Sequence, residues 1–92
     1  MKPPTITAAR AIDDLTLLVE FSNHDRKYYN VKHLLNIPMF QLLRNPAFFR
    51  GFQVDKGGYG IVWNEDIDLS EYELWQNGSD VLLETDRTSI SL

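Results

Sequence analysis

Glycines and carboxylates that could do chemistry lie close together in the segment GGYGIVWNEDIDLSEYELW, residues 57–75. A glycine-rich loop that opens a helix binds phosphate through its backbone amides, and in a P-loop it is followed by Lys-Ser or Lys-Thr. Gly-Gly-Tyr-Gly at 57–60 is followed by neither pair, and a strand is predicted after it. Two short apolar runs around such a turn are typical of a β-hairpin. We therefore predict a hairpin here, with no phosphate or cofactor site.

The carboxylates after that turn match part of a calcium-binding loop. Asp66, Asp68 and Ser70 have the spacing of the first three EF-hand ligands. That loop next requires a glycine, where Glu71 stands, and later a bidentate glutamate, where Asn77 stands. Because the match fails at both positions, we predict no metal site.

The start of a short helix accounts for the same residues. Ser70 and Glu73 have the spacing of a capping box, in which each side chain accepts a hydrogen bond from the other residue's backbone amide. Asn77-Gly78 is typical of a left-handed helix stop. We therefore predict one helix over residues 71–77.

Histidines are the remaining candidates for acid–base chemistry. The chain contains two, His24 and His33, and no cysteine. Neither histidine is spaced to pair with a nucleophile, and an RNase that used both would also need a phosphate-binding cleft, which the sequence does not indicate. We predict no catalytic residues and do not expect an enzyme.

Basic and aromatic residues lie close together in residues 26–32. Arg26, Lys27 and Lys32 could contact nucleic acid phosphates, and tyrosines could stack on bases. A strand, however, would send Tyr28 and Tyr29 to opposite faces, so both cannot belong to one platform. We favour a charged edge strand and keep nucleic acid binding as the alternative.

The predicted last helix carries the candidate contacts to a protein partner. Tyr72 and Trp75 are residue types that recur at interface hot spots, and Glu71 adds charge beside them. Partial burial of Trp75 against a sheet is the other interpretation. Residues 1–64 hold eight Lys/Arg and five Asp/Glu (+3), whereas residues 65–92 hold one Arg and eight Asp/Glu (−7). The acidic end would steer a basic protein and repel nucleic acid.

The elements that must position these residues form one α+β domain over residues 3–78. Period-two alternation predicts an antiparallel β-meander of strands at 5–12, 15–21 and 26–31. Short helical turns follow from Asn30, Pro38 and Asn45-Pro46, with five apolar side chains facing a sheet: Leu34, Leu35, Phe40, Leu42 and Leu43. With the hairpin, this gives a two-layer fold. Residues 79–92 form an acidic tail, expected to add an edge strand at 81–83 or to be disordered.

Length and composition limit the class of protein. The 92 residues are enough for one domain, and no apolar run approaches the roughly 20 residues of a membrane helix. The first ten residues have no apolar stretch of a secretory signal, so we expect a cytoplasmic protein without membrane contact. A homodimer through an edge strand is compatible with these features.

The order of the elements resembles a bacterial family called domain of unknown function 2442. The resemblance rests on LTLLVEFSNHDRKYYNVKHLL, then PMFQLLRNPAFFRGFQV, then WNEDIDLSEYEL, and covers about Pro3 to Gly78. It implies a two-layer α+β fold, no established catalytic residues, and an antitoxin-like protein encoded beside a small protein. His24 stands in a turn where the family usually has glycine. Longer relatives continue into a helix-turn-helix domain that is not matched here.

We therefore expect a non-enzymatic protein-interaction module, the antitoxin-like partner of a small neighbouring protein. The alternatives are a nucleic-acid-binding transcriptional regulator and a small-ligand-binding domain with a pocket between sheet and helices.

Overall fold

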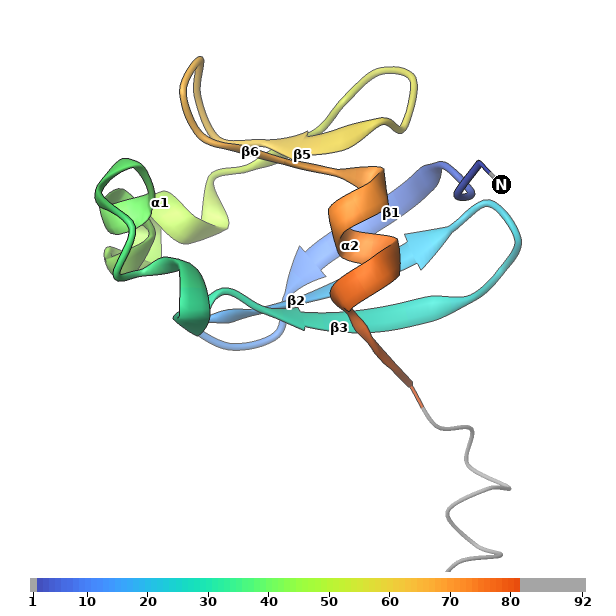
Figure 1. The fold of residues 1–92 in the computed structure, drawn as a ribbon, viewed down its shortest axis with the longest axis horizontal. Coiled ribbons are helices and arrows are strands. Elements are labelled where there is room, and N and C mark those ends of the chain that lie inside the picture. Colours follow the sequence, from blue (N-terminus) through green and yellow to red (C-terminus); the bar gives the residue numbers. More distant parts are fainter. Residues whose placement is uncertain (1, 82–92) are drawn as a thin grey trace, which may run out of the picture.

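The computed structural model describes residues 2–81 and has an α+β fold in two layers, as predicted. Figure 1 shows a larger sheet with a smaller sheet and the helices on one side of it. The larger sheet has the order β1-β2-β3-β7 and the smaller one β4-β5-β6, with every pairing antiparallel. The elements are β1 (Ile6–Ala11), β2 (Thr16–Phe21), β3 (Arg26–Asn30), the 3₁₀ helices η1 (Lys32–Leu34) and η2 (Pro38–Arg44), α1 (Pro46–Arg50), β4 (Gln53–Val54), β5 (Gly60–Val62), β6 (Asp68–Ser70), α2 (Glu71–Asn77) and β7 (Ser79–Asp80).

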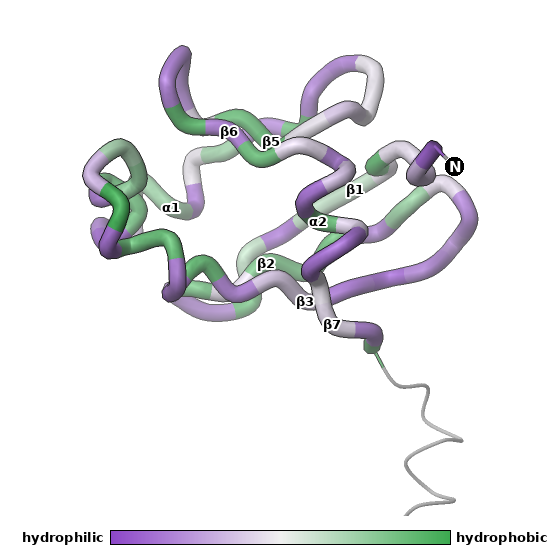
Figure 2. The backbone as a smooth tube through the Cα atoms, in the orientation of Figure 1, coloured by the Kyte–Doolittle hydropathy of each residue, from purple (hydrophilic) through white to green (hydrophobic). Residues whose placement is uncertain are grey.

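The meander follows the predicted alternation of apolar and polar residues. Leu17 and Val19 of β2 are fully buried, whereas Glu20 is exposed. On β3, Tyr29 is buried and Tyr28 is exposed, so the two tyrosines occupy opposite faces as expected. Figure 2 shows apolar residues along β2 and polar residues in the turn that joins β2 to β3. One face of the larger sheet therefore forms the floor of the core.

The β2–β3 turn forces His24 into a left-handed conformation, with φ of 72°. The His24 amide donates to the Phe21 carbonyl at 2.9 Å, and the Asn23 side-chain oxygen accepts from the Asp25 amide at 3.0 Å. A non-glycine residue pays a steric cost in this region. The turn thus has the backbone for which glycine is best suited.

The short helices begin close to the predicted positions. Pro38 opens η2, and Asn45 caps α1, where its side-chain oxygen accepts from the amides of Ala47 and Phe48 at 2.9 and 3.2 Å. At η1 the N-cap is Val31, and Asn30 accepts from the Lys32 amide at 2.8 Å.

The prediction that Leu42 faces the sheet is wrong. Leu43 is fully buried and Phe40 is half-buried, but Leu42 is 54% exposed. The reason is that η2 is a 3₁₀ helix, in which residues three apart lie in line. Phe40 and Leu43 share the inner side, whereas Met39 and Leu42 share the outer side. The predicted inward positions of Leu34 and Leu35 are confirmed.

The predicted hairpin is present as β4 and β5, and it carries a third strand that the sequence analysis did not find. β6 pairs Leu69 with Ile61 immediately before α2 begins. The turn of the hairpin reaches β1, because the Ile6 amide donates to the Gly58 carbonyl at 2.8 Å. Gly58 has φ of 77°, and an added Cβ there would lie 2.6 Å from the Ile6 carbonyl oxygen. Glycine is therefore required where the hairpin crosses the edge of the larger sheet.

Helix α2 has the predicted bounds, but its two ends differ in detail from the prediction. The Ser70 hydroxyl accepts from the Glu73 amide at 3.1 Å, which is one half of the capping box. The other half is wrong, because the Glu73 carboxylate accepts from the Tyr29 hydroxyl. The left-handed stop is also wrong, because Gly78 is extended with φ of −73°. Glycine is required at position 78 for close packing, because an added Cβ would lie 2.5 Å from the Leu74 carbonyl oxygen.

After Gly78 the chain joins the edge of the larger sheet. Ser79 pairs with Tyr28 and Asp80 with Lys27, and the Val81 amide donates to the Arg26 carbonyl at 3.2 Å. The predicted edge strand at 81–83 falls largely outside the described residues, as does the rest of the acidic tail. Within residues 2–81, no helix combines the length and the apolar character needed to cross a membrane.

Candidate functional site

Helix α2 is the element that presents the predicted partner-binding residues. Leu74 is fully buried and anchors the helix on the core, whereas Tyr72 is 57% exposed. Glu71 and Trp75 are half-buried and lie four residues apart, which makes them neighbours on the helix surface. The structure therefore places Tyr72, Trp75 and Glu71 along one short helix, with Tyr72 the most accessible of the three.

Trp75 is held in place by two side chains of the larger sheet. Its ring meets the Phe21 ring edge-on, with centroids 5.1 Å apart and planes at 76°. The Lys27 Nζ lies 4.4 Å from the Trp75 ring centroid in a cation–π contact. Lys27 also forms an ion pair of 3.4 Å with Asp80 of β7. Trp75 is thus a fixed platform whose remaining surface faces outward.

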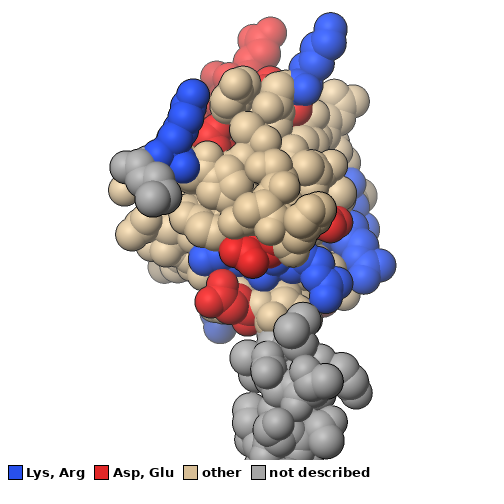
Figure 3. All heavy atoms as spheres, turned by 90° about the vertical axis from the view of Figure 1, so that its right-hand side faces the viewer, with Lys and Arg blue, Asp and Glu red and all other residues tan. Residues whose placement is uncertain are grey.

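Beside this platform lies a shallow hollow of about 430 Å³, which we call the Tyr72–Trp75 surface. Figure 3 faces this side of the molecule, where uncharged residues (tan) occupy the middle and charged residues lie around them. The N-terminal segment forms its other wall, and the sequence analysis gave no signal for that contribution. The lining residues are Lys2, Pro3, Pro4, Asn23, Tyr72, Trp75 and Gln76.

A hydrogen-bonded cluster beneath α2 was also missed from the sequence. The Tyr29 hydroxyl donates to Glu73 Oε2 at 2.7 Å and lies 3.1 Å from His33 Nε2. Since that hydroxyl proton points to Glu73, His33 Nε2 must be the donor to the tyrosine oxygen. Burial, then the bond to Glu73 and its negative charge, raise the pKa of Tyr29 above its ordinary value of 10.0. The cluster attaches α2 to β3 and η1. Tyr29 and Glu73, which it joins, are 44 residues apart in the chain.

The basic residues of the nucleic acid alternative do not share one surface. Lys27 points to the α2 side of β3, where it is engaged with Trp75 and Asp80. Arg26 points to the opposite face of the sheet, and Lys32 is exposed on η1. On that opposite face Arg26 joins Arg10, which was not predicted.

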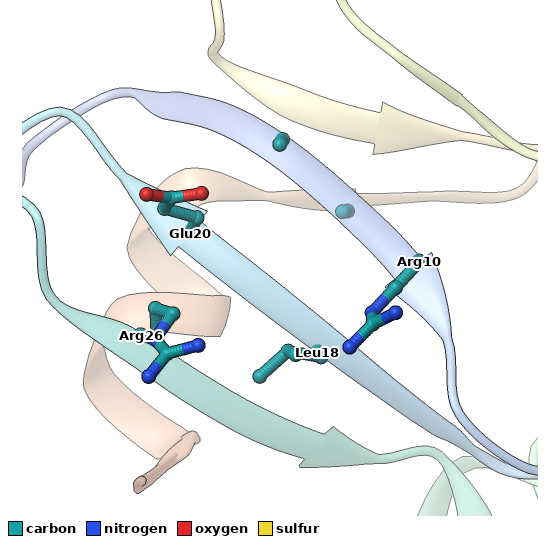
Figure 4. Close-up of a pocket in the computed structure, with 6 residues that line it drawn as sticks. Arg10, Leu18, Glu20 and Arg26 are labelled. Carbon is teal, nitrogen blue, oxygen red and sulfur yellow. The ribbon is translucent and has the colours of Figure 1, made fainter. Parts of the chain in front are cut away.

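Within residues 2–81, no helix covers this outer face of the larger sheet. Figure 4 shows Arg10, Leu18, Glu20 and Arg26 projecting from β1, β2 and β3 beside a shallow hollow of about 240 Å³. Glu20 is in register with Arg26 on the neighbouring strand. The carboxylate therefore offsets part of the positive charge of this face.

Comparison with known proteins identifies the family of the chain. The model of the family described as "Protein of unknown function (DUF2442)" matches residues 6–79, which include every strand and helix except the final residue of β7. No curated protein and no solved structure matches the chain. Since the match spans more than half of the sequence, the chain belongs to the DUF2442 family.

Proposed function

We propose that this chain is a non-enzymatic protein-binding module of the bacterial cytoplasm, which occludes a small neighbouring protein in the manner of an antitoxin. The observation that carries the proposal is the Tyr72–Trp75 surface. An exposed tyrosine stands there beside a tryptophan that is already immobilised, and every lining residue of the hollow except Lys2 is uncharged.

The composition of this surface is that of a protein interface. Interface centres are enriched in tyrosine and tryptophan and depleted of charge, and their rims are polar. Because Trp75 is held by Phe21 and Lys27, little side-chain entropy is lost when a partner covers it. Pro3 and Pro4 on the other wall are conformationally restricted, so they also lose little entropy when a partner binds.

Charge supports a basic partner. Residues 65–92 carry eight Asp/Glu and one Arg, and Glu71 stands at the start of the helix that presents Tyr72. Such a field accelerates the encounter with a positively charged protein, and the aromatic residues then supply the affinity. Occlusion needs no bond to be made or broken, only a stoichiometric complex.

The test is co-expression of the tagged chain with the product of the adjacent gene, followed by affinity purification and native mass spectrometry. We expect a complex of defined stoichiometry that Tyr72→Ala weakens about tenfold or more. Tyr59→Ala is the matched control, because Tyr59 is 56% exposed and does not line the hollow. Absence of any complex contradicts the proposal, and equal retention by both variants removes Tyr72 from it.

The nucleic acid alternative keeps one observation in its favour, the presence of Arg10 and Arg26 on one uncovered sheet face. It predicts a salt-dependent shift of labelled DNA or RNA that Arg10→Ala and Arg26→Ala weaken. No shift at low salt would remove it.

A further inference from the structure

The outer side of η2 exposes more apolar surface than its place in the fold requires. Met39 is 55% exposed and Leu42 is 54% exposed, and Ile37 just before them is 42% exposed. In a 3₁₀ helix Met39 and Leu42 stand in line, so they form one ridge and not two separate side chains. Single exposed apolar residues are common, but a group of them on one surface is typical of a contact site.

The ridge forms one wall of a groove of about 730 Å³, whose other wall is the β5–β6 loop. The segments that line the groove, η2 and the β5–β6 loop, lie at the α1 end of the molecule in Figure 1, away from the N-terminus. The loop wall contributes Asn64, Asp66 and Ile67. Asn64 Oδ1 accepts from the amides of Asp66 and Ile67 at 2.9 and 2.8 Å, which fixes the loop. The groove is therefore open and already shaped.

We propose that this groove binds an amphipathic helix of a protein partner, whose apolar stripe is flanked by lysine or arginine on one side only. A 3₁₀ helix rises about 2 Å per residue, so Met39 and Leu42 lie about 6 Å apart along its axis. An α-helix rises about 1.5 Å per residue, so apolar side chains at i and i+4 of the partner are also about 6 Å apart along its axis and match this spacing. A ridge of that period interdigitates with a helical stripe.

An extended peptide is a poorer occupant than a helix. The groove is lined by a helix and by a loop whose amides are bonded to Asn64, so it has no open strand edge to pair with. A strand placed there would bury backbone amides and carbonyls without partners, whereas a helix satisfies its own.

Charge fixes the flanks of that helix. Asp66 lines the loop wall, and Glu65 and Asp68 adjoin it in the chain, so the flank facing the loop carries basic residues. Arg44 stands on the opposite wall, where its Nη2 donates to the Leu35 carbonyl at 3.1 Å. An acidic or neutral flank suits that side. The two walls thus also set the direction in which the helix lies across the groove.

The experiment is a titration of the full, ¹⁵N-labelled chain with a synthetic amphipathic peptide about 18 residues long, with a leucine stripe, lysine on one flank and glutamine on the other, followed by NMR of the backbone amides. We expect saturable shifts at Met39, Leu42 and Asp66. A peptide with glutamate in place of lysine should bind about tenfold more weakly or worse. A scrambled leucine–lysine peptide controls for charge alone.

Variants separate this groove from general stickiness and from the proposed function. Leu42→Glu, or Met39→Glu if the first misfolds, should weaken the leucine–lysine peptide about tenfold or more, whereas Ile12→Glu should not. Ile12 is an exposed apolar residue that does not line the groove. Tyr72→Ala should leave this binding unchanged, so its outcome is independent of the Tyr72–Trp75 surface. Shifts spread over residues outside the groove, or equal binding of the scrambled peptide, would overturn the inference.

Discussion

Replacing Tyr29 by phenylalanine should loosen α2 from the sheet without creating a cavity. Phenylalanine fills the same buried space but removes the hydroxyl that donates to Glu73 Oε2 at 2.7 Å and accepts from His33 Nε2. The removed bond is the single side-chain hydrogen bond that joins α2 to β3 among the described residues. The change therefore isolates one long-range attachment of the helix.

The size of the effect follows from the charge and burial of the partners. A hydrogen bond to a charged group contributes about 1.5–3 kcal/mol to the free energy of unfolding. Glu73 is half-buried, so water can replace part of the lost bond. We expect Tyr29→Phe to cost about 1–2 kcal/mol. For a domain of this size each kcal/mol lowers the melting temperature by about 4–8 °C.

Urea unfolding of four proteins measures this term: the parent chain, Tyr29→Phe, Glu73→Gln and the double variant. We expect a coupling energy of about 1 kcal/mol between the two sites. Tyr28→Phe is the matched control, because Tyr28 is the exposed neighbour on the opposite face of β3. Additive single effects, or equal losses for Tyr28→Phe and Tyr29→Phe, would refute the attachment.

The same residue makes stability depend on pH at the alkaline end. The pKa of Tyr29 is raised in the folded state, first by burial and then by Glu73, above the ordinary 10.0. The unfolded chain therefore releases this proton at lower pH than the folded one. The contribution of Tyr29 is fully present below about pH 10 and is lost as the pH rises toward the folded pKa. Tyr29→Phe should abolish this part of the alkaline loss, measured as the difference between the two proteins in urea unfolding at pH 8 and pH 11.

Three further substitutions test the backbone assignments by urea unfolding. Gly78→Ala places a Cβ 2.5 Å from the Leu74 carbonyl oxygen and should cost about 1–3 kcal/mol; a neutral result would mean that the helix end can move away from β3. His24→Gly relieves the left-handed turn and should stabilise by about 0.5 kcal/mol, since part of the gain is lost to backbone entropy. Asn45→Ala removes the cap of α1 and should cost about 1 kcal/mol, whereas an unchanged midpoint would show that Pro46 alone starts that helix.

Local patterns predicted the elements because their causes are local. The period-two alternation of β2, the Asn45-Pro46 start of α1 and the Ser70 cap of α2 each depend on residues within a few positions. Strand β6 has three residues, and the last of them, Ser70, is also the N-cap of α2, so only its pairing with β5 reveals it. The outward turn of Leu42 depends on the choice between 3₁₀ and α geometry, which packing decides in so short a segment.

In the candidate site, too, some features follow from the local sequence and others only from the folded structure. Tyr72, Trp75 and Glu71 were identified by residue type and by their place on one helix, which sequence supplies. The contribution of Pro3, and the bond from Tyr29 to Glu73, join segments that are far apart in the chain. No spacing rule connects such segments, so they emerge only from the folded structure.

Helix α2 is oriented by packing against the larger sheet and exposes Tyr72. A helix of seven residues is too short to be stable alone, so its orientation must come from packing. Leu74 in the core, Glu73 bonded to Tyr29, and Trp75 between Phe21 and Lys27 supply that orientation from three directions. Since those residues are engaged inward, Tyr72 is left to point outward on a rigid support. Loss of Tyr72 should therefore change binding while leaving the free energy of unfolding nearly unchanged, whereas loss of Tyr29 should do the reverse in the first instance.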